Sequence, residues 1–310
     1  DLAVERATAA VDAERVWLAA GEQLREQVTQ VAPERLVLEP SGRDTLPALV
    51  LAVSAIADTD PEAVVAVVTA DHLIEPLAAF ALTIGQGFAV AEQDADALVT
   101  FGVVPDHAST AFGYLELGAP LEGGAVRVER FAEKPQQRRA EQLLEQGALW
   151  NSGMFVWQAA TFLRAARAFA PDTVALVERV RAGDAEAWDS VPRSSVDYGV
   201  MEPASTSPDF VVAALPLAAR WLDVGSWPQY GDAVGRDARG NAVGPALTTL
   251  LDSKDCVVAS SDPAHLVALV GCEGLVVVHT ARATLVVPAD QAQRVKELHA
   301  AVAADHPELS

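Results

Sequence analysis

Residues 63–69 read Ala-Val-Val-Ala-Val-Val-Thr, and Ala70, Asp71 and His72 follow directly. Apolar residues fill both faces of this run, which predicts a central parallel strand covered by helices on each side. In open α/β sheets, ligands bind beyond the carboxyl ends of the strands. Asp71 therefore stands where a carboxylate could hold a divalent metal against the phosphates of a nucleotide. A plain helix cap explains Asp71 equally well, and His72 is expected to be structural.

Strand and helix patterns alternate on either side of this run. A helix is predicted over residues 46–57, with Thr45 as its N-cap and Pro47 in its first turn. The repeated strand–helix–strand units predict a doubly wound, Rossmann-like α/β fold, and extra strands around residues 113–155 make its sheet a mixed one. The other predicted strands are 15–19, 35–38 and 97–103, and the other predicted helices are 2–11, 22–31, 75–84, 136–146, 159–170 and 171–182.

The pattern changes beyond Gly240 to short strands followed by one closing helix. A turn-rich stretch at residues 236–244, RDARGNAVG, separates this tail from the rest of the chain. We therefore predict a large α/β domain over residues 1–236 and a small β-rich module over residues 237–310 that ends in a helix. The predicted strands of the module are 256–259, 266–270, 275–279 and 284–287, and its helix covers about 290–304.

The composition excludes several classes of protein. The 310 residues carry a formal net charge of −21, which argues against non-specific nucleic-acid binding and against docking on an anionic membrane surface. No run reaches the roughly 20 apolar residues of a membrane span, and no signal peptide is visible. Cys256 and Cys272 lie in apolar stretches and are expected to be buried reduced thiols. We expect a cytoplasmic protein.

The stretch Glu39–Pro47, EPSGRDTLP, runs from a strand end through a glycine turn to a helix start. Such a turn could bring backbone N–H groups and Arg43 to a ligand. Glu39 is a candidate for recognising guanine, because guanine presents adjacent N1–H and N2–H donors that one carboxylate can accept in parallel. By itself, the segment is also compatible with a loop that binds nothing.

Glu133-Lys134-Pro135 and, one helix later, the stretch WNSGMF at residues 150–155 form a third signal. In so acidic a protein, Lys134 could neutralise a phosphate while Glu133 accepts hydrogen bonds from sugar hydroxyls. Asn151 offers both a donor and an acceptor, as polyol recognition requires. The alternative is an exposed ion pair of little energetic value beside a common Asn-Ser-Gly turn.

The stretch WLDVGSW at residues 221–227 is a fourth signal, in which Asp223 follows an apolar run. A second carboxylate could share one Mg²⁺ with Asp71. Mg²⁺ usually takes one or two protein carboxylates and keeps its remaining positions for water and phosphate. The two tryptophans alone would more often mean packing.

Taken together along the chain, the four segments resemble the mannose-1-phosphate guanylyltransferase family of sugar-phosphate nucleotidyltransferases. The family pattern E-P-x-G-R-N-T-x-P-A stands here as EPSGRDTLPA, with Asp44 in place of the usual Asn. The A-D-H, F-x-E-K-P, W-N-S-G-M-F and D-V-G-S-W segments match closely, as does DYGVME at residues 197–202. The resemblance covers essentially the whole chain. It implies transfer of GMP from GTP to mannose 1-phosphate, which gives GDP-mannose and pyrophosphate.

The resemblance also implies a mechanism and a set of roles. The sugar phosphate attacks the α-phosphorus in line, without a covalent enzyme intermediate, and catalysis comes from positioning and from cations. Asp71 and Asp223 are assigned to Mg²⁺ and, together with Lys134 on the sugar phosphate, to catalysis. The nucleotide is assigned to Glu39, Gly42, Arg43, Asp44 and Thr45, and the hexose to Gly113, Glu133, Asn151 and Asp197.

One departure from the family concerns the N-terminal segment. The family opens with a strand and a G-G-x-G-T-R-L-x-P loop that binds the triphosphate, followed by P-K-Q, and the 310 residues contain neither motif. We therefore expect an apolar sheet edge, and better binding of product sugar nucleotide than turnover of GTP. The stretch TAFGY at residues 110–114 also departs from T-G-Y-G-Y, although Gly113 is kept.

Two other functions stay open at this point. One is a glucose-1-phosphate thymidylyl- or uridylyltransferase, and the other is a non-catalytic homologue that binds sugar nucleotide without turnover. The E-P-x-G-R and W-N-S-G-M-F motifs favour guanine as the base and mannose as the sugar over the alternatives of the first function. No phosphomannose isomerase module follows the small β-rich module, so we expect a single-function enzyme. The oligomeric state is open, and a homodimer is compatible with the sequence.

Overall fold

The structure, a computed structural model, describes residues 2–306. The chain forms two compact units: one contains the residues up to Ala70 and Ile74–Trp221, and the other contains Asp71–Leu73 and the residues from Leu222 onward. The predicted domain boundary at residues 236/237 falls inside the second unit. The outer ends of the two predicted domains, residue 1 and residues 307–310, lie outside the described residues.

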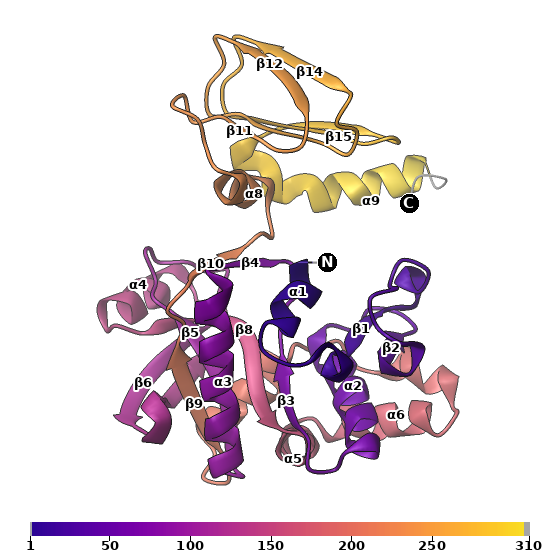
Figure 1. Ribbon diagram of the computed structural model, residues 1–310, viewed down its shortest axis with the longest axis vertical. Helices are drawn as coiled ribbons and strands as arrows, with labels where there is room; N and C mark the ends of the chain where they lie inside the picture. Colours follow the sequence, from indigo (N-terminus) through magenta and orange to yellow (C-terminus); the bar gives the residue numbers. More distant parts are fainter. Residues whose placement is uncertain (1, 307–310) are drawn as a thin grey trace. The chain divides into compact units, whose positions relative to one another are not determined.

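A mixed sheet forms the centre of the first unit (Figure 1). Among the described residues its strand order is β3 (Val64–Val67), β8 (Leu149–Gln158), β5 (Ala97–Val103), β9 (Val211–Pro216), β7 (Val126–Ala132) and β6 (Tyr114–Pro120). Strands β5 and β9 run parallel, whereas β8 runs antiparallel to both β3 and β5. The predicted doubly wound α/β fold with a mixed sheet is confirmed.

The placement of the Val-rich strand is a correction. We expected a central parallel strand at residues 63–69, but β3 lies at the edge of the sheet, pairs antiparallel with β8, and is only half-buried. The apolar run indicates that other elements pack against both faces of the strand. It carries no information about which strand pairs along each edge, because pairing is made by backbone groups that every residue shares.

Helices cover both faces of this sheet. Helix α3 (Leu77–Gln93) packs on one face, with Val99 and Phe101 of β5 in its hydrophobic cluster. The other face is covered by α2 (Thr45–Thr59), α5 (Ala159–Phe169) and α6 (Pro171–Arg181), whose cluster includes Leu98 of β5. This alternation along β5 is the period-two pattern of a strand between two layers.

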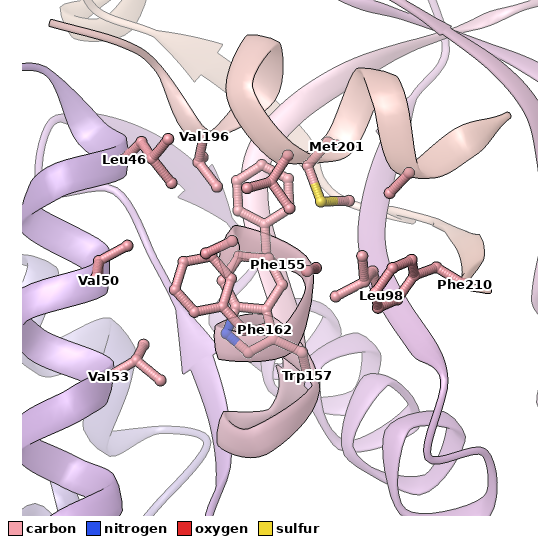
Figure 2. Packing of buried hydrophobic residues seen from close by; sticks show 14 of the residues in the cluster. Leu46, Val50, Val53, Leu98, Phe155, Trp157, Phe162, Val196, Met201 and Phe210 are labelled. Carbon is pink, nitrogen blue, oxygen red and sulfur yellow. The ribbon is translucent and has the colours of Figure 1, made fainter. Parts of the chain in front are cut away.

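An aromatic stack fills the centre of the second layer. Figure 2 shows Leu46, Val50 and Val53 of α2 lining the same core as Phe155, Trp157 and Phe162. The ring centroids of Phe155 and Trp157 lie 5.2 Å apart, and those of Trp157 and Phe162 lie 4.5 Å apart. Stacked pairs of this kind contribute about 0.5–1.5 kcal/mol beyond the area that they bury. They hold β8 firmly against α5.

The N-terminal part of the first unit differs from the sequence prediction. After α1 (Leu2–Thr8), β1 (Leu18–Gly21) and β2 (Leu36–Glu39) pair in parallel as a two-stranded sheet. The helix predicted over residues 22–31 is wrong, since only the 3₁₀ turn Glu22–Leu24 forms there. Its residues are mostly exposed, so no apolar face is buried, and burial is what stabilises most helices in proteins.

The remaining elements of the first unit include α4 (Gln137–Glu145), the π-helical turn Asp197–Met201 and α7 (Glu202–Ser205). Helix α4 ends before Gly147, whose φ of 77° confirms the predicted glycine stop. The short strands β4 (His72–Glu75) and β10 (Arg220–Asp223) pair with each other where the chain passes between the two units.

The second unit is a small β module with helices α8 (Trp227–Val234) and α9 (Val295–Asp305). Strands β11 (Ala242–Val243), β13 (Val257–Ser260) and β15 (Leu275–His279) run parallel, and β16 (Thr284–Pro288) pairs antiparallel with β15. Strands β12 (Leu247–Leu251) and β14 (Leu266–Val270) form a second parallel pair. The module is confirmed, although β11 and β12 were not predicted. No helix within residues 2–306 has the length and apolarity needed to cross a lipid bilayer.

Candidate functional site

Three chain segments of the first unit converge on Asn151. Its backbone N–H donates a 2.8 Å hydrogen bond to the carbonyl oxygen of Gly113, which precedes β6. Its side-chain Nδ2 donates a 2.8 Å hydrogen bond to Oδ1 of Asp197, the first residue of the π-helical turn. Local π-helical turns are frequent at functional sites. The structure therefore brings together three of the residues that were predicted to bind the hexose.

Glu133 and Lys134 follow β7 and form an ion pair. Nζ of Lys134 lies 3.3 Å from Oε1 of Glu133; the Lys134 side chain is 62% exposed and the Glu133 side chain only 14%. The other carboxylate oxygen of Glu133 packs against Gly113, where a Cβ atom would lie 2.6 Å from Oε2. A larger residue at position 113 would therefore displace this carboxylate oxygen from its place. Lys134 has a φ of 43°, in the left-handed region that non-glycine residues seldom adopt.

Gly113, Glu133, Lys134, Asn151 and Asp197 form a polar cluster. Both of its carboxyl groups have a raised pKa. Burial, together with the neighbouring Asp197 carboxylate, raises the pKa of Glu133 to about 7, although Lys134 acts in the opposite direction. Burial also raises the pKa of Asp197, against the hydrogen bond from Asn151. A cluster of this kind suits a ligand that offers hydroxyl donors to the carboxyl groups and an anionic group to Lys134.

Thr100 also belongs to this cluster and was not predicted from the sequence. Its hydroxyl donates a 2.7 Å hydrogen bond to Oδ1 of Asn151, and the side chain is fully buried in β5. The available signal was a single threonine at the centre of the otherwise apolar run 97–103. Buried hydroxyls need a partner, and the sequence does not show where that partner lies.

The predicted nucleotide-binding segment occupies the turn between β2 and α2. Burial raises the pKa of Glu39, and the nearby backbone N–H of Arg43 acts in the opposite direction. Oε2 of Glu39 is buried and accepts no hydrogen bond within residues 2–306. Because this atom is buried, a ligand donor reaches it only if the side chain turns or neighbouring atoms move aside. Space around Gly42 is open, since a Cβ built there would meet no atom within 4 Å.

The guanidinium group of Arg43 is engaged with the protein. Its Nη2 donates a 3.0 Å hydrogen bond to the backbone oxygen of Asp189 and lies 3.5 Å from the carboxylate of that residue. Arg43 therefore anchors the turn. The prediction that it reaches a ligand through its side chain stays untested.

The helix cap in this turn is a correction. Asp44, and not Thr45, caps α2: Oδ1 of Asp44 accepts a 2.8 Å hydrogen bond from the backbone N–H of Thr45. Asp44 has φ 72° and ψ −176°, a backbone conformation that is almost restricted to glycine. The hydroxyl of Thr45 instead accepts a 2.9 Å hydrogen bond from the N–H of Val196. This bond ties the turn that was predicted to bind the nucleotide to the residue that precedes Asp197.

The two predicted metal ligands, Asp71 and Asp223, both lie near His72 in the second unit. Nε2 of His72 lies 3.9 Å from Oδ1 of Asp71 and 3.8 Å from Oδ1 of Asp223. Asp71 is 71% exposed and Asp223 is 32% exposed, so both carboxylates are open to a ligand. Within residues 2–306, no group of three or more His, Cys, Asp or Glu side chains is arranged to hold a metal by itself. Asp71 and Asp223 nevertheless fit Mg²⁺ by chemical type, because Mg²⁺ binds one or two protein carboxylates and takes its remaining ligands from water and phosphate.

A separate surface cavity of about 650 Å³ lies beside the junction of α5 and α6. Arg130, Phe169, Tyr198 and Glu202 are among its lining residues. None of the predicted site residues lines it. We therefore place the candidate site at the β2–α2 turn and at the polar cluster of Gly113, Glu133, Lys134, Asn151 and Asp197, where the residues predicted to bind nucleotide and sugar phosphate lie.

Comparison with known proteins gives matches to both units. Residues 13–239 match the family described as Nucleotidyl transferase. Residues 248–300 match the MannoseP isomerase/GMP-like beta-helix domain. The second match covers most of the small β module, including β14 and β15.

Individual relatives match over most of this chain. The chain is 37% identical over 290 residues to the xanthan biosynthesis protein XanB of Xanthomonas campestris pv. campestris (strain B100), covering 90% of this chain and 59% of that protein. It is 35% identical over 301 residues to the mannose-1-phosphate guanylyltransferase of Escherichia coli (strain K12), covering 92% of this chain and 60% of that protein. The chain thus spans about three fifths of the length of these relatives.

The crystal structure described as mannose-1-phosphate geranyltransferase from Thermus thermophilus is 32% identical in sequence. The two structures superpose with a TM-score of 0.83. The superposition covers 96% of this chain and 87% of the Thermus thermophilus chain. Because a family match spans residues 13–239 and a structural relative at this identity is covered almost whole, the chain belongs to the nucleotidyl transferase family.

Proposed function

We propose that this nucleotidyl transferase transfers GMP from GTP to mannose 1-phosphate, giving GDP-mannose and pyrophosphate. The observation that carries the proposal is the polar cluster. It places the ammonium group of Lys134 beside side chains that can hydrogen-bond to hydroxyl groups, namely those of Glu133, Asn151 and Asp197. This combination matches the chemistry of a sugar phosphate. The name of the relative from Escherichia coli, mannose-1-phosphate guanylyltransferase, supports mannose and guanine over other pairs.

The choice of base rests on Glu39. The side chain of Glu39 is only partly buried, and its carboxylate would accept the two adjacent N–H donors of guanine in parallel. Adenine cannot offer this pair of donors. The open space at Gly42 supports an approach of the base to the backbone of the turn.

In the proposed reaction, an oxygen of the sugar phosphate forms a bond to the α-phosphorus of GTP while the bond from that phosphorus to the bridging oxygen of pyrophosphate breaks. Lys134 would hold the phosphate of the sugar, and Glu133, Asn151 and Asp197 would fix the hexose so that the attacking oxygen is in line. Asp71 and Asp223 would hold Mg²⁺. When bound, Mg²⁺ would neutralise the negative charge that develops on the phosphates.

The test is a product assay of the purified protein with GTP, mannose 1-phosphate and MgCl₂, in which GDP-mannose and pyrophosphate are both quantified. Parallel reactions pair UTP or dTTP with glucose 1-phosphate. We expect GDP-mannose to form fastest. A faster reaction with glucose 1-phosphate would identify a thymidylyl- or uridylyltransferase. Tight binding of GDP-mannose without any product formation would identify a sugar-nucleotide-binding protein.

A further inference from the structure

Thr100 occupies a position where a hydroxyl is costly. It lies at the centre of β5, is fully buried, and has the apolar residues Val99 and Phe101 as its neighbours in the chain. Valine has nearly the same shape and would need no hydrogen-bond partner there. Burial of a hydroxyl is unfavourable unless the group is hydrogen-bonded. Packing and strand propensity therefore do not explain the threonine, and its hydrogen bonds do.

The hydroxyl has two acceptors within reach but only one proton. Its oxygen lies 2.7 Å from Oδ1 of Asn151 and 3.1 Å from the backbone oxygen of Met154. Nδ2 of Asn151 donates to Asp197, so Oδ1 is the amide atom that faces Thr100. An amide oxygen only accepts hydrogen bonds, so Thr100 donates its proton across the shorter contact.

The side-chain amide of Asn151 is thus held from both sides. A rotation by 180° would bring its oxygen against the Asp197 oxygen that now accepts from Nδ2, and two acceptors would then face each other. The backbone of Asn151 is fixed as well, through its bond to Gly113. The remaining N–H and the remaining lone pair of the amide therefore keep a defined polarity, which is what discrimination between the hydroxyls of a sugar requires.

We propose that Thr100 is a positioning residue that sets the side-chain amide of Asn151 for recognition of the hexose, an inference that rests on the proposed function. Thr100 acts only through Asn151. Loss of its hydroxyl should therefore weaken binding of the sugar phosphate selectively and leave binding of the nucleotide unchanged.

Three variants test the inference: Thr100→Val removes the hydroxyl at nearly constant shape, Thr100→Ser keeps it, and Thr83→Val is the matched control. Thr83 is also a buried threonine whose hydroxyl is bonded, to the backbone oxygen of Ala79 at 2.8 Å, and it lies in α3. For Thr100→Val we expect KM for mannose 1-phosphate to rise on the order of tenfold, as for a lost or misdirected hydrogen bond, with KM for GTP unchanged. Thr100→Ser and Thr83→Val should keep both constants near wild type.

A second readout does not depend on activity. The side-chain ¹H–¹⁵N signals of Asn151, identified by their disappearance in Asn151→Ala, should shift in Thr100→Val and stay unchanged in Thr83→Val. Unchanged Asn151 signals in Thr100→Val would overturn the inference, and so would a Thr100→Ser variant as impaired as Thr100→Val. Should Thr100→Val fail to fold, Thr100→Ala removes the hydroxyl instead, and Thr83→Ala becomes the control for the lost volume.

The outcomes separate this inference from the proposed function. A wild-type protein that neither makes GDP-mannose nor binds mannose 1-phosphate would refute the proposed function. The Asn151 signals would still decide whether Thr100 orients the amide. A wild-type protein that is active, beside a Thr100→Val variant with unchanged KM for the sugar phosphate, would refute the inference alone.

Discussion

Nζ of Lys134 lies 3.3 Å from Oε1 of Glu133, yet the lysine side chain is 62% exposed and the glutamate side chain only 14%. The two partners thus differ in their surroundings: the carboxylate is fixed beside Gly113, while the ammonium group stays accessible to a ligand. An exposed ion pair contributes little to stability. We infer that Lys134 serves binding more than folding.

Replacement of Lys134 by Met should weaken mannose 1-phosphate binding. Loss of a charge-assisted contact to the sugar phosphate costs about 1.5–3 kcal/mol, which is on the order of 10- to 100-fold in Kd. Isothermal titration calorimetry with mannose 1-phosphate measures the change, and thermal unfolding checks that the fold is intact. Lys254→Met is the control, since Lys254 forms a comparably exposed pair with Glu273 at 2.9 Å. Equal affinities of the two variants would mean that Lys134 is only a surface partner of Glu133.

Stability should depend on pH through Glu133. Its pKa rises from an ordinary 4.5 to about 7 on folding, so the folded state binds more protons than the unfolded state between these values. The stabilisation linked to the protonated carboxyl is complete below pH 4.5 and is lost as the pH rises through 7. Urea unfolding at pH 5, 6, 7 and 8 should show a falling free energy of unfolding, with a shallower fall for Glu133→Gln. Identical slopes would contradict the raised pKa. Asp197, whose pKa shifts in the same direction, should leave a residual slope in the variant.

Selectivity for guanine should depend on Glu39. Replacement by Gln keeps the shape but removes the charge, so discrimination should fall by about 1.5–3 kcal/mol for each charge-assisted bond that is lost. Competition binding with GDP-mannose and ADP-mannose measures the ratio of affinities. Glu34→Gln, an exposed glutamate in the 3₁₀ turn that leads into β2, is the matched control. If the ratio of affinities is unchanged in Glu39→Gln, the backbone of residues 42–45, and not Glu39, recognises the base.

The requirement for Mg²⁺ should change with Asp223. In Asp223→Asn, the concentration of Mg²⁺ for half-maximal activity should rise on the order of tenfold or more, because one of two anionic oxygen ligands is lost. Asp290→Asn changes an exposed carboxylate in the same unit and should leave the titration unchanged. A Mg²⁺ titration of product formation gives both values. If Asp223→Asn and wild type have the same midpoint, Asp223 is not a metal ligand.

The sequence by itself determined the elements whose signal is local. Strand β5 runs from Ala97 to Val103, the same bounds that the apolar run predicted, and Gly147 ends α4 because glycine adopts positive φ without strain. The mixed α/β sheet and the β module followed in the same way from periodicity. The segments that carry Glu133, Asn151 and Asp197 were recognisable because their spelling resembles a known family.

Only the tertiary structure decided what these residues touch. Strand β3 lies at an edge, Asp44 replaces Thr45 as the helix cap, and the guanidinium of Arg43 is held by Asp189. Thr100 meets Asn151, 51 residues further along the chain, because β5 and β8 pair antiparallel with a register shift between Thr100 and Gly102, and Gly102 is the residue that pairs with Asn151. That register is set by the packing of both sheet faces together, and a slip by one residue would move every side chain to the opposite face. Local sequence fixes the conformation of a segment, but partners distant in the chain are chosen by the free energy of the whole fold.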